Sequence, residues 1–285
     1  MDCEIQWAPA RLLPFGLSGW YILDMKTLSF IPLCACFLPG WFSTGGVDWS
    51  HHFSGVDGTF VLLDGNSGRY TRFNEARAGQ RFPPCSTFKI PNSAIALETG
   101  AAPDADFTLH YDPAFRLKGD WARDHTLRTA FRFSVVWYYQ EMARRVGPAT
   151  MARFVRQFGY GNEDTSGEVD RFWLGKPLGI SADEQVRFLK RFYEGQLGLS
   201  ERTTRLVKEI MLTEEGPDWR LSGKTGACGE EGQDVALWYV GYVEKQGQVF
   251  FFALEMGGRD YEPLFGQRIP KTKAILKDLG ILPRS

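Results

Sequence analysis

The pattern of apolar and polar residues predicts two groups of β-strands, one towards each end of the chain. The segments 58–64 and 69–73 are strand-like and flank Gly65-Asn66-Ser67-Gly68, a combination typical of a β-hairpin. Near the C-terminus, three strand-like segments follow one another closely, at 220–225, 235–243 and 249–255.

Helical periodicity dominates between these groups. It predicts helices over 86–100, 134–146, 149–158 and 181–194, and a last helix over 269–279. Ser181-Ala-Asp-Glu184 has the spacing of a capping box. The order of elements indicates an α+β fold. We expect the strands from both ends to form one antiparallel sheet with flanking helices and an inserted helical lobe, with a cleft between the two lobes.

Residues 1–45 have a different character. Residues 1–24 fit neither a folded element nor a targeting signal, and we interpret them as an upstream extension before a start at Met25. Residues 25–45 combine a lysine, a short apolar stretch and small residues, as in a secretory signal peptide, and the stretch is too short to span a membrane. A disordered tail and a lipid anchor at Cys36 are the alternatives. We expect residues 46–285 to be one secreted, periplasmic catalytic domain with a mixed α/β lobe and a helical lobe, not inserted in the membrane.

Composition removes several classes of function. The 285 residues include 33 basic and 34 acidic ones without a long basic run, so nucleic acid is not an expected partner. The five cysteines form no C-x-x-C pair and the four histidines lack ligand spacing, so we expect no metal. Cleavage of the leader would leave only Cys85 and Cys228, either bridged or as free thiols.

Candidate chemistry begins at Ser86-Thr87-Phe88-Lys89, at the start of a predicted helix. Residues three apart share a helix face, so Lys89 could act as a base towards the Ser86 hydroxyl if burial kept its amine neutral. Alone the motif is weak, because a serine N-cap followed by a surface lysine has the same spacing. Ser134 and Lys224-Thr225-Gly226 follow in the order found in β-lactamases and penicillin-binding proteins, which is far more specific.

The sequence resembles the class D serine β-lactamases, and hence the serine β-lactamase/penicillin-binding-protein-like fold, over roughly residues 57–283. The resemblance rests on Ser86-Thr87-Phe88-Lys89, Ser134-Val135-Val136, Tyr160-Gly161-Asn162, Phe172-Trp173-Leu174-Gly175 and Lys224-Thr225-Gly226. It implies that the chain opens β-lactam rings, which would give antibiotic resistance. It also implies that Tyr160-Gly161-Asn162 supports loop architecture rather than chemistry.

The resemblance further assigns roles on the nucleophile side of the site. Ser86 would be acylated, and Lys89 would be the general base as N6-carboxylysine. The chain would then need CO₂ or bicarbonate but no other cofactor, and no separate glutamate for deacylation. The Trp173 indole would donate a hydrogen bond to the carbamate, although a plain core tryptophan is the alternative. Val136 and Leu174 would line the approach of water and CO₂.

On the leaving-group side, the resemblance makes Ser134 a proton relay, although it could also be a helix N-cap. Lys224 and Thr225 of the Lys-Thr-Gly226 motif would bind the substrate carboxylate. Arg268 would bind it too, though Arg259 lies nearby and a solvated helix-start arginine is the alternative. The backbone N–H groups of Ser86 and Ala227 would form the oxyanion hole.

Cys85 directly precedes the nucleophile, and Cys228 lies two residues after Gly226. Some class A carbapenem-hydrolysing enzymes resemble this chain in having a disulfide at the same relative positions, which suggests a Cys85–Cys228 bond. Two buried thiols are the alternative.

Three other functions remain open on sequence: a β-lactam sensor that stays acylated, a penicillin-binding transpeptidase or carboxypeptidase, and an inactive module on the same fold. The sequence leaves open a monomer or a homodimer. Substrate range would depend on the loops at 118–125 and 228–233.

Overall fold

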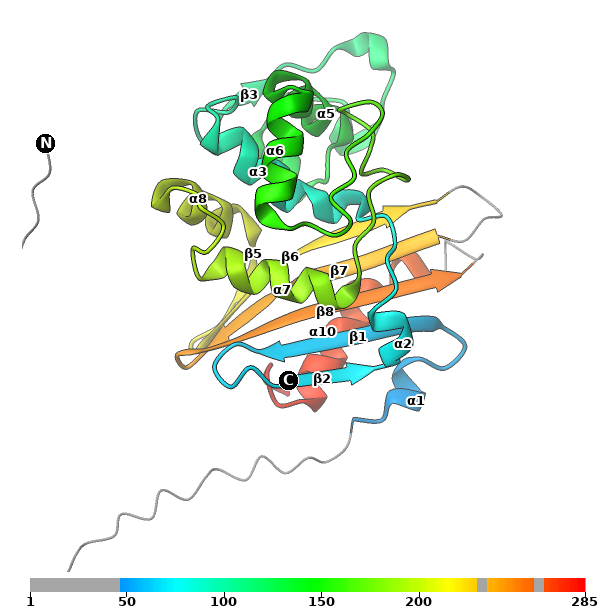
Figure 1. Cartoon of the computed structure of the whole chain (residues 1–285). Helices are drawn as coiled ribbons and strands as arrows, with labels where there is room; N and C mark the ends of the chain where they lie inside the picture. Colours follow the sequence, from blue (N-terminus) through cyan, green and yellow to red (C-terminus); the bar gives the residue numbers. More distant parts are fainter. Residues whose placement is uncertain (1–46, 230–234, 259–263, 285) are drawn as a thin grey trace, which may run out of the picture. The chain divides into compact units, whose positions relative to one another are not determined.

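The computed structural model describes residues 47–229, 235–258 and 264–284 (Figure 1). The predicted extension and signal peptide at 1–45 lie outside these ranges, as do Arg259 and most of the 228–233 loop. The strands are Asp57–Asp64 (β1), Tyr70–Phe73 (β2), Thr108–Leu109 (β3), His125–Thr126 (β4), Leu212–Glu215 (β5), Trp219–Cys228 (β6), Val235–Lys245 (β7) and Gln248–Gly258 (β8).

The helices occupy most of the chain between β2 and β5. The α-helices are Trp49–His52 (α1), Glu75–Ala78 (α2), Lys89–Glu98 (α3), Leu127–Arg132 (α4), Val136–Val146 (α5), Pro148–Phe158 (α6), Ala182–Tyr193 (α7), Glu201–Met211 (α8) and Arg268–Asp278 (α10). Short 3₁₀ turns are Cys85–Phe88 (η1), Pro113–Phe115 (η2) and Gly119–Trp121 (η3). No helix in the described ranges is both long and apolar enough to cross a membrane.

One antiparallel sheet joins strands from both ends of the chain, in the order β2-β1-β8-β7-β6-β5. The N-terminal hairpin β1–β2 pairs with the C-terminal strands through β8, as predicted. Strands β6, β7 and β8 are consecutive neighbours, with Gly226 opposite Trp238 and Trp238 opposite Glu255. The Lys224-Thr225-Gly226 motif therefore lies in the sheet, one strand from its β5 edge.

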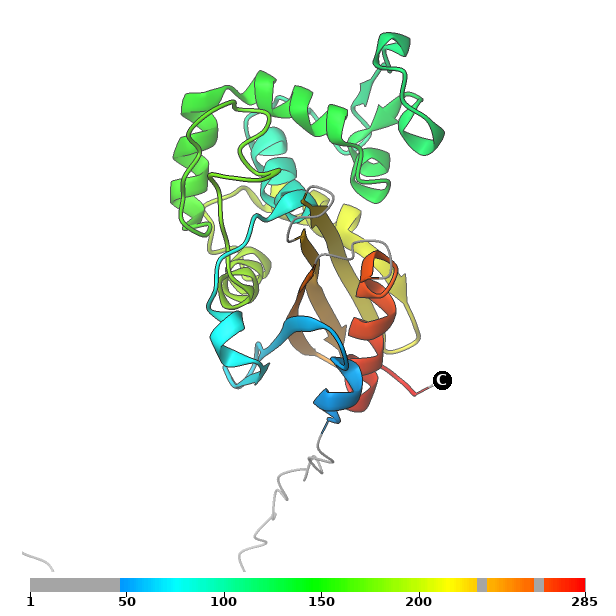
Figure 2. The same cartoon turned by 90° about the vertical axis from the view of Figure 1, so that its right-hand side faces the viewer.

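Helices cover both faces of the sheet because its central strands are apolar on both sides. Phe60, Leu237 and Leu254 face α10, where they pack with Ile275 and Leu276. The alternate residues on the same strands belong to the core shared with the other helices. Figure 2 shows α10 and α7 on opposite sides of the strands. The predicted antiparallel sheet with flanking helices is confirmed.

The helix boundaries depend on local capping. The capping box at the start of α7 is present as predicted: the Ser181 hydroxyl accepts from the Glu184 N–H at 3.2 Å, and the Glu184 carboxylate accepts from the Ser181 N–H at 2.9 Å. The helix predicted from Ser134 instead begins at Val136, with Val135 as its N-cap. The N-cap interpretation of Ser134 is therefore wrong. The elements α1, α2, α4, α8, β5 and the β3–β4 pair have no counterpart among the predicted elements.

Candidate active site

The Ser86 side chain meets the Lys89 amine inside the protein. The 3₁₀ turn η1 carries Ser86 and runs directly into α3, whose first residue is Lys89. Lys89 Nζ donates to Ser86 Oγ over 2.9 Å, and the Lys89 side chain is fully buried. A capping serine followed by a surface lysine is therefore the wrong interpretation: the N-cap of η1 is Pro84, and Ser86 faces a buried amine.

The surroundings of Lys89 favour a neutral amine. Burial lowers the pKa of Lys89 to about 7, since an ammonium group loses its hydration there. The Tyr139 ring lies 5.2 Å from Nζ, measured to the ring centroid. Phe88, which directly precedes Lys89 in the chain, stacks on Trp173 with ring centroids 5.3 Å apart. A substantial fraction of the Lys89 amine is thus unprotonated near neutral pH.

Ser134 forms a second serine–lysine pair with Lys224 of β6. Lys224 Nζ donates to Ser134 Oγ over 3.0 Å and to the Thr225 carbonyl over 2.9 Å. Burial lowers the pKa of Lys224 well below its ordinary value, and the positive charges of Lys89 and Arg268 lower it further. Because Gly226 of the same strand lies against Pro84 and Thr87 on either side of Ser86, both pairs belong to one site.

The Lys-Thr-Gly strand lies directly against the nucleophile turn. A Cβ on Gly226 would stand 3.0 Å from the Pro84 carbonyl oxygen and 3.0 Å from the Thr87 methyl group, so a larger residue would require its neighbours to shift. Thr225 and Ala227, on either side of Gly226, remain partly exposed. These residues form the edge along which a substrate could lie.

Arg268, the first residue of α10, also belongs to this region. Its side chain is only 7% exposed, so the interpretation as a solvated arginine is wrong. Its Nη1 donates to the Gly226 carbonyl and its Nε to the Phe265 carbonyl, both over 2.8 Å. The structure thus brings the predicted carboxylate-binding cation to the Lys-Thr-Gly strand.

Val136 begins α5, two residues after Ser134, and Trp173 and Leu174 lie in the loop before α7. Trp173 is 1% exposed, whereas Val136 and Leu174 are partly exposed. In the same loop, Asn162 donates to the Pro177 carbonyl over 2.9 Å and accepts from the Gly179 N–H over 3.0 Å. Asn162 therefore joins two parts of this loop, at Pro177 and Gly179.

A disulfide joins Cys85, next to the nucleophile, to Cys228 at the end of β6. Their Cα atoms are 5.6 Å apart, within the usual range for such a bond. The Cys85 N–H also donates to the Trp173 carbonyl over 3.0 Å. Cys85 thus links the turn η1 to β6 through the disulfide and to the loop that carries Trp173 through its backbone N–H.

Sequence reasoning missed three aromatic residues that support the site. Tyr139 lies over the lysine amine. Trp121 donates its indole N–H to the Phe133 carbonyl, one residue before Ser134, over 3.0 Å. Trp238 donates its indole N–H to the Pro83 carbonyl over 2.9 Å. Only Trp238 carried a signal, as part of the stretch Trp238-Tyr-Val-Gly-Tyr-Val that contributes to the family resemblance.

Two hollows of the described surface lie mostly away from the predicted site residues. One of about 840 Å³ lies between α7, α8 and the sheet and contains none of the predicted site residues. Another of about 790 Å³ reaches the site only through Leu174 and Cys228. In the described ranges, no cluster of three histidine, cysteine or acidic side chains could hold a metal ion. The site is therefore defined by its serine–lysine pairs.

This fold and these pairs define a protein of the serine β-lactamase and penicillin-binding type. Residues 58–279 match the family model described as "Penicillin binding protein transpeptidase domain". The chain is 43% identical over 237 residues to β-lactamase OXA-48 of Klebsiella pneumoniae, an alignment covering 82% of this chain and 89% of the relative. It is 39% identical over 266 residues to β-lactamase OXA-10 of Pseudomonas aeruginosa, covering 90% of this chain and 99% of the relative.

Solved structures agree with the sequence relatives. The class D β-lactamase YbXI from Nostoc superposes with a TM-score of 0.79 at 38% identity, covering 83% of this chain and all of the other. The structure of BPu1 β-lactamase gives a TM-score of 0.76, also at 38% identity, over 84% of this chain and all of the other. The chain belongs to the class D serine β-lactamases. It is a β-lactam hydrolase that acts on small-molecule substrates.

Proposed function

We propose that the chain hydrolyses penicillins and related β-lactams through an ester on Ser86, with Lys89 carboxylated on Nζ. The observation that carries this proposal is the fully buried Lys89 amine, 2.9 Å from Ser86 Oγ. CO₂ reacts with neutral amines, and burial lowers the pKa of Lys89 to about 7, so this lysine suits the modification. A carbamate there would supply a carboxylate base for both the serine proton and a hydrolytic water.

The other side chains suit the remaining steps of acyl transfer. Ser86 Oγ would bond to the lactam carbonyl carbon while the backbone N–H groups of Ser86 and Ala227 bind the developing oxyanion. The ring C–N bond would then break, and the nitrogen would take a proton from Ser134, which Lys224 contacts over 3.0 Å. Water would finally cleave the ester and free Ser86.

Residues next to the two serine–lysine pairs would bind the substrate and control access to the site. Thr225 and Arg268, on β6 and α10, would bind the substrate carboxylate, since both adjoin Gly226. The Trp173 indole would donate to the carbamate, while Val136 and Leu174 would control the entry of water and CO₂.

Hydrolysis of oxacillin and a chromogenic cephalosporin by residues 46–285, with and without bicarbonate, tests the proposal. We expect bicarbonate to raise turnover, and Ser86→Ala and Lys89→Ala to abolish it. Stoichiometric labelling of Ser86 without turnover in either condition would instead identify a sensor or a penicillin-binding protein.

Export to the periplasm through residues 25–45, and antibiotic resistance as its result, form part of the same proposal. Expression of the full chain in a susceptible bacterium should raise the minimum inhibitory concentration of oxacillin, and deletion of residues 1–45 should abolish the gain. Light scattering of the processed protein would decide between the proposed monomer and homodimer.

A further inference from the structure

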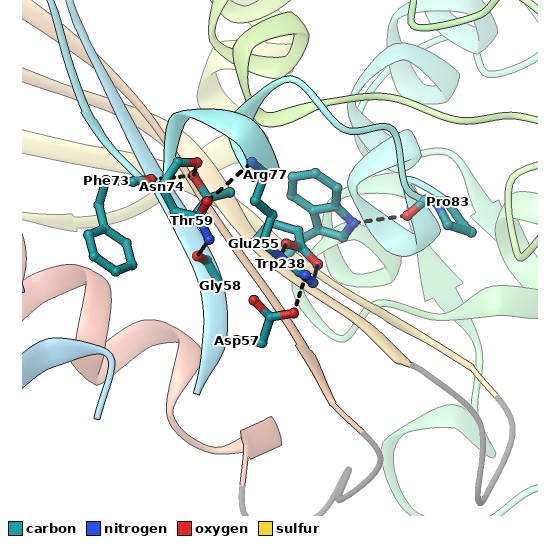
Figure 3. Close-up of polar contacts among 9 residues, drawn as sticks. All are labelled: Asp57, Gly58, Thr59, Phe73, Asn74, Arg77, Pro83, Trp238 and Glu255. Atoms are coloured by element: carbon teal, nitrogen blue, oxygen red, sulfur yellow. Dashed lines mark hydrogen bonds and ion pairs between the residues drawn. The ribbon is translucent and has the colours of Figure 1, made fainter. Parts of the chain in front are cut away.

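Trp238 joins the central strand β7 to the segment that leads into the nucleophile turn. Its side chain is completely buried, and its indole N–H donates to the Pro83 carbonyl over 2.9 Å (Figure 3). Pro83 lies three residues before Ser86 and, like all prolines, has no N–H to hold it in a sheet. The indole therefore supplies a polar contact where the local backbone cannot donate one.

The same tryptophan faces the Lys-Thr-Gly strand. Trp238 pairs with Gly226 across the β6–β7 ladder. Gly226 in turn bears against Pro84 and Thr87, where an added Cβ would lie 3.0 Å from the Pro84 oxygen and from the Thr87 methyl group. The segment 83–87, which carries Ser86, thus contacts the sheet where Gly226 of β6 pairs with Trp238 of β7. The indole hydrogen bond therefore joins this segment to β7, the strand that pairs with β6.

A buried ion pair and an aromatic contact hold the indole in place. Glu255, opposite Trp238 on β8, is fully buried, and its carboxylate accepts from Arg77 Nε over 2.6 Å and from Nη2 over 3.0 Å (Figure 3). The Arg77 guanidinium lies 4.6 Å above the Phe82 ring, whose edge meets Trp238 at a centroid distance of 6.4 Å. The ion pair thus lies beside Trp238 on the neighbouring strand, and Phe82 contacts the indole directly.

We propose that Trp238 is a positioning residue that fixes the Ser86 turn against strand β6 and thereby aligns the two halves of the oxyanion hole. This inference rests on the proposed function, because it takes the Ser86 and Ala227 N–H groups as the oxyanion donors. One donor belongs to the nucleophile turn and the other to β6, so their convergence depends on the contact between these two segments. Trp238 acts through that contact and not on the substrate itself.

The expected consequence is a loss in the chemical steps without a loss in binding. An oxyanion forms in acylation and again in deacylation, so both rate constants should fall together when the donors separate. The noncovalent dissociation constant of the substrate and the bicarbonate requirement depend on Thr225, Arg268 and Lys89, and should stay unchanged.

The test compares Trp238→Phe and Trp238→Tyr with the wild-type chain. Both variants lose the indole N–H but leave different volumes unfilled. Acylation and deacylation rate constants would be measured by rapid mixing with a chromogenic cephalosporin, and scaled to the active sites counted as Ser86 ester by mass spectrometry. We expect both rate constants to fall about tenfold or more in both variants, because small misplacements of reacting groups have effects of that size. Either variant suffices if the other does not fold.

Trp219→Phe is the matched control, because Trp219 is a partly buried tryptophan at the opposite end of β6. It should keep the wild-type rate constants. Wild-type rate constants per active site in both Trp238 variants, or losses that follow the missing volume and the fall in melting temperature, would overturn the positioning role. Absence of any Ser86 ester in the wild-type chain would instead refute the proposed function.

Discussion

Lys224 donates from Nζ to Oγ of Ser134 over 3.0 Å, although ninety residues separate the two in the sequence. Ser134 stands in a left-handed backbone conformation, with φ of 56°, between α4 and α5. The Val135 N–H closes the end of α4 by donating to the Ala130 carbonyl over 2.9 Å. Because of this tight connection, Ser134 lies before the first turn of α5 instead of in it. In this position its hydroxyl accepts the hydrogen bond from Lys224 of β6.

Removal of either partner should slow the opening of the β-lactam ring. We expect Ser134→Ala and Lys224→Ala each to lower kcat/KM by about 10²-fold or more, the usual range for a proton-transfer group. Because the two residues act as one unit, kcat/KM of the double variant should be no lower than that of the less active single variant. Steady-state kinetics of the three proteins would decide, and multiplicative losses would contradict a shared role. Lys190→Ala on α7 is a surface control, since its ammonium pairs only with Glu194 among the contacts described.

The pKa of Lys89 predicts how the need for CO₂ changes with pH. Burial lowers this pKa to about 7, so the neutral amine that reacts with CO₂ predominates above that pH and becomes scarce below it. Formation of the carbamate anion from the neutral amine and CO₂ also releases one proton. The dissolved CO₂ required for half-maximal turnover should therefore rise as the pH falls, about tenfold per pH unit above the pKa of Lys89 and about a hundredfold per unit below it. Turnover titrated with CO₂ between about pH 5.5 and 8.5 would measure this. A requirement that is constant across the range would exclude control by the Lys89 amine.

Trp173 should act on the modified lysine rather than on the nucleophile. Loss of a hydrogen bond to a charged group costs about 1.5–3 kcal/mol, so Trp173→Phe should raise the half-saturating bicarbonate concentration by about ten- to a hundredfold. Acylation and deacylation of Ser86 should both slow at low bicarbonate, since both use the carbamate, and high bicarbonate should restore them. Phe172→Leu is the matched control, because Phe172 also packs on Phe88, at 5.1 Å between ring centroids, but has no N–H to donate. An equal shift in both variants would indicate packing alone.

The Cys85–Cys228 bond should stabilise the folded chain. It spans 143 residues, and a loop of that length gives up to about 5 kcal/mol in the chain-entropy model. We expect Cys85→Ser combined with Cys228→Ser to lower the free energy of unfolding by several kcal/mol in denaturant titrations. Reduction of the wild-type chain should have the same effect. Thiol titration of unfolded, unreduced residues 46–285 is the direct measurement, and two reactive thiols would rule the bond out.

Local features of the fold could be predicted because their causes are local. The capping box of Ser181 and Glu184 needs only residues three apart, and so does the approach of Ser86 to Lys89. The strands β7 and β8 follow from nearly continuous apolar runs. The helix α8 was missed although Ser200 caps it and Val207 and Ile210 are buried on one face, a signal that periodicity could have found.

Contacts between distant segments needed the tertiary structure. The sequence placed Ser134 and Lys224 in the right order, but only family resemblance paired them. From the sequence, Arg268 could be either solvated or part of the site. In the structure its guanidinium is held in the site by hydrogen bonds to the Gly226 and Phe265 carbonyls. Nothing in the local pattern indicated that the Trp238 indole meets Pro83, because that contact depends on where the nucleophile segment crosses the sheet.

The sequence by itself indicated the candidate reacting groups, the longer strands and most of the longer helices, since these depend on residue type and short spacing. Only the tertiary structure decided how far each group is buried and which partners it meets. Burial is what brings the pKa of Lys89 to about 7, and it results from side chains such as Tyr139 that are remote in sequence. A lysine becomes a candidate base here because the surrounding core removes the water that would keep it charged.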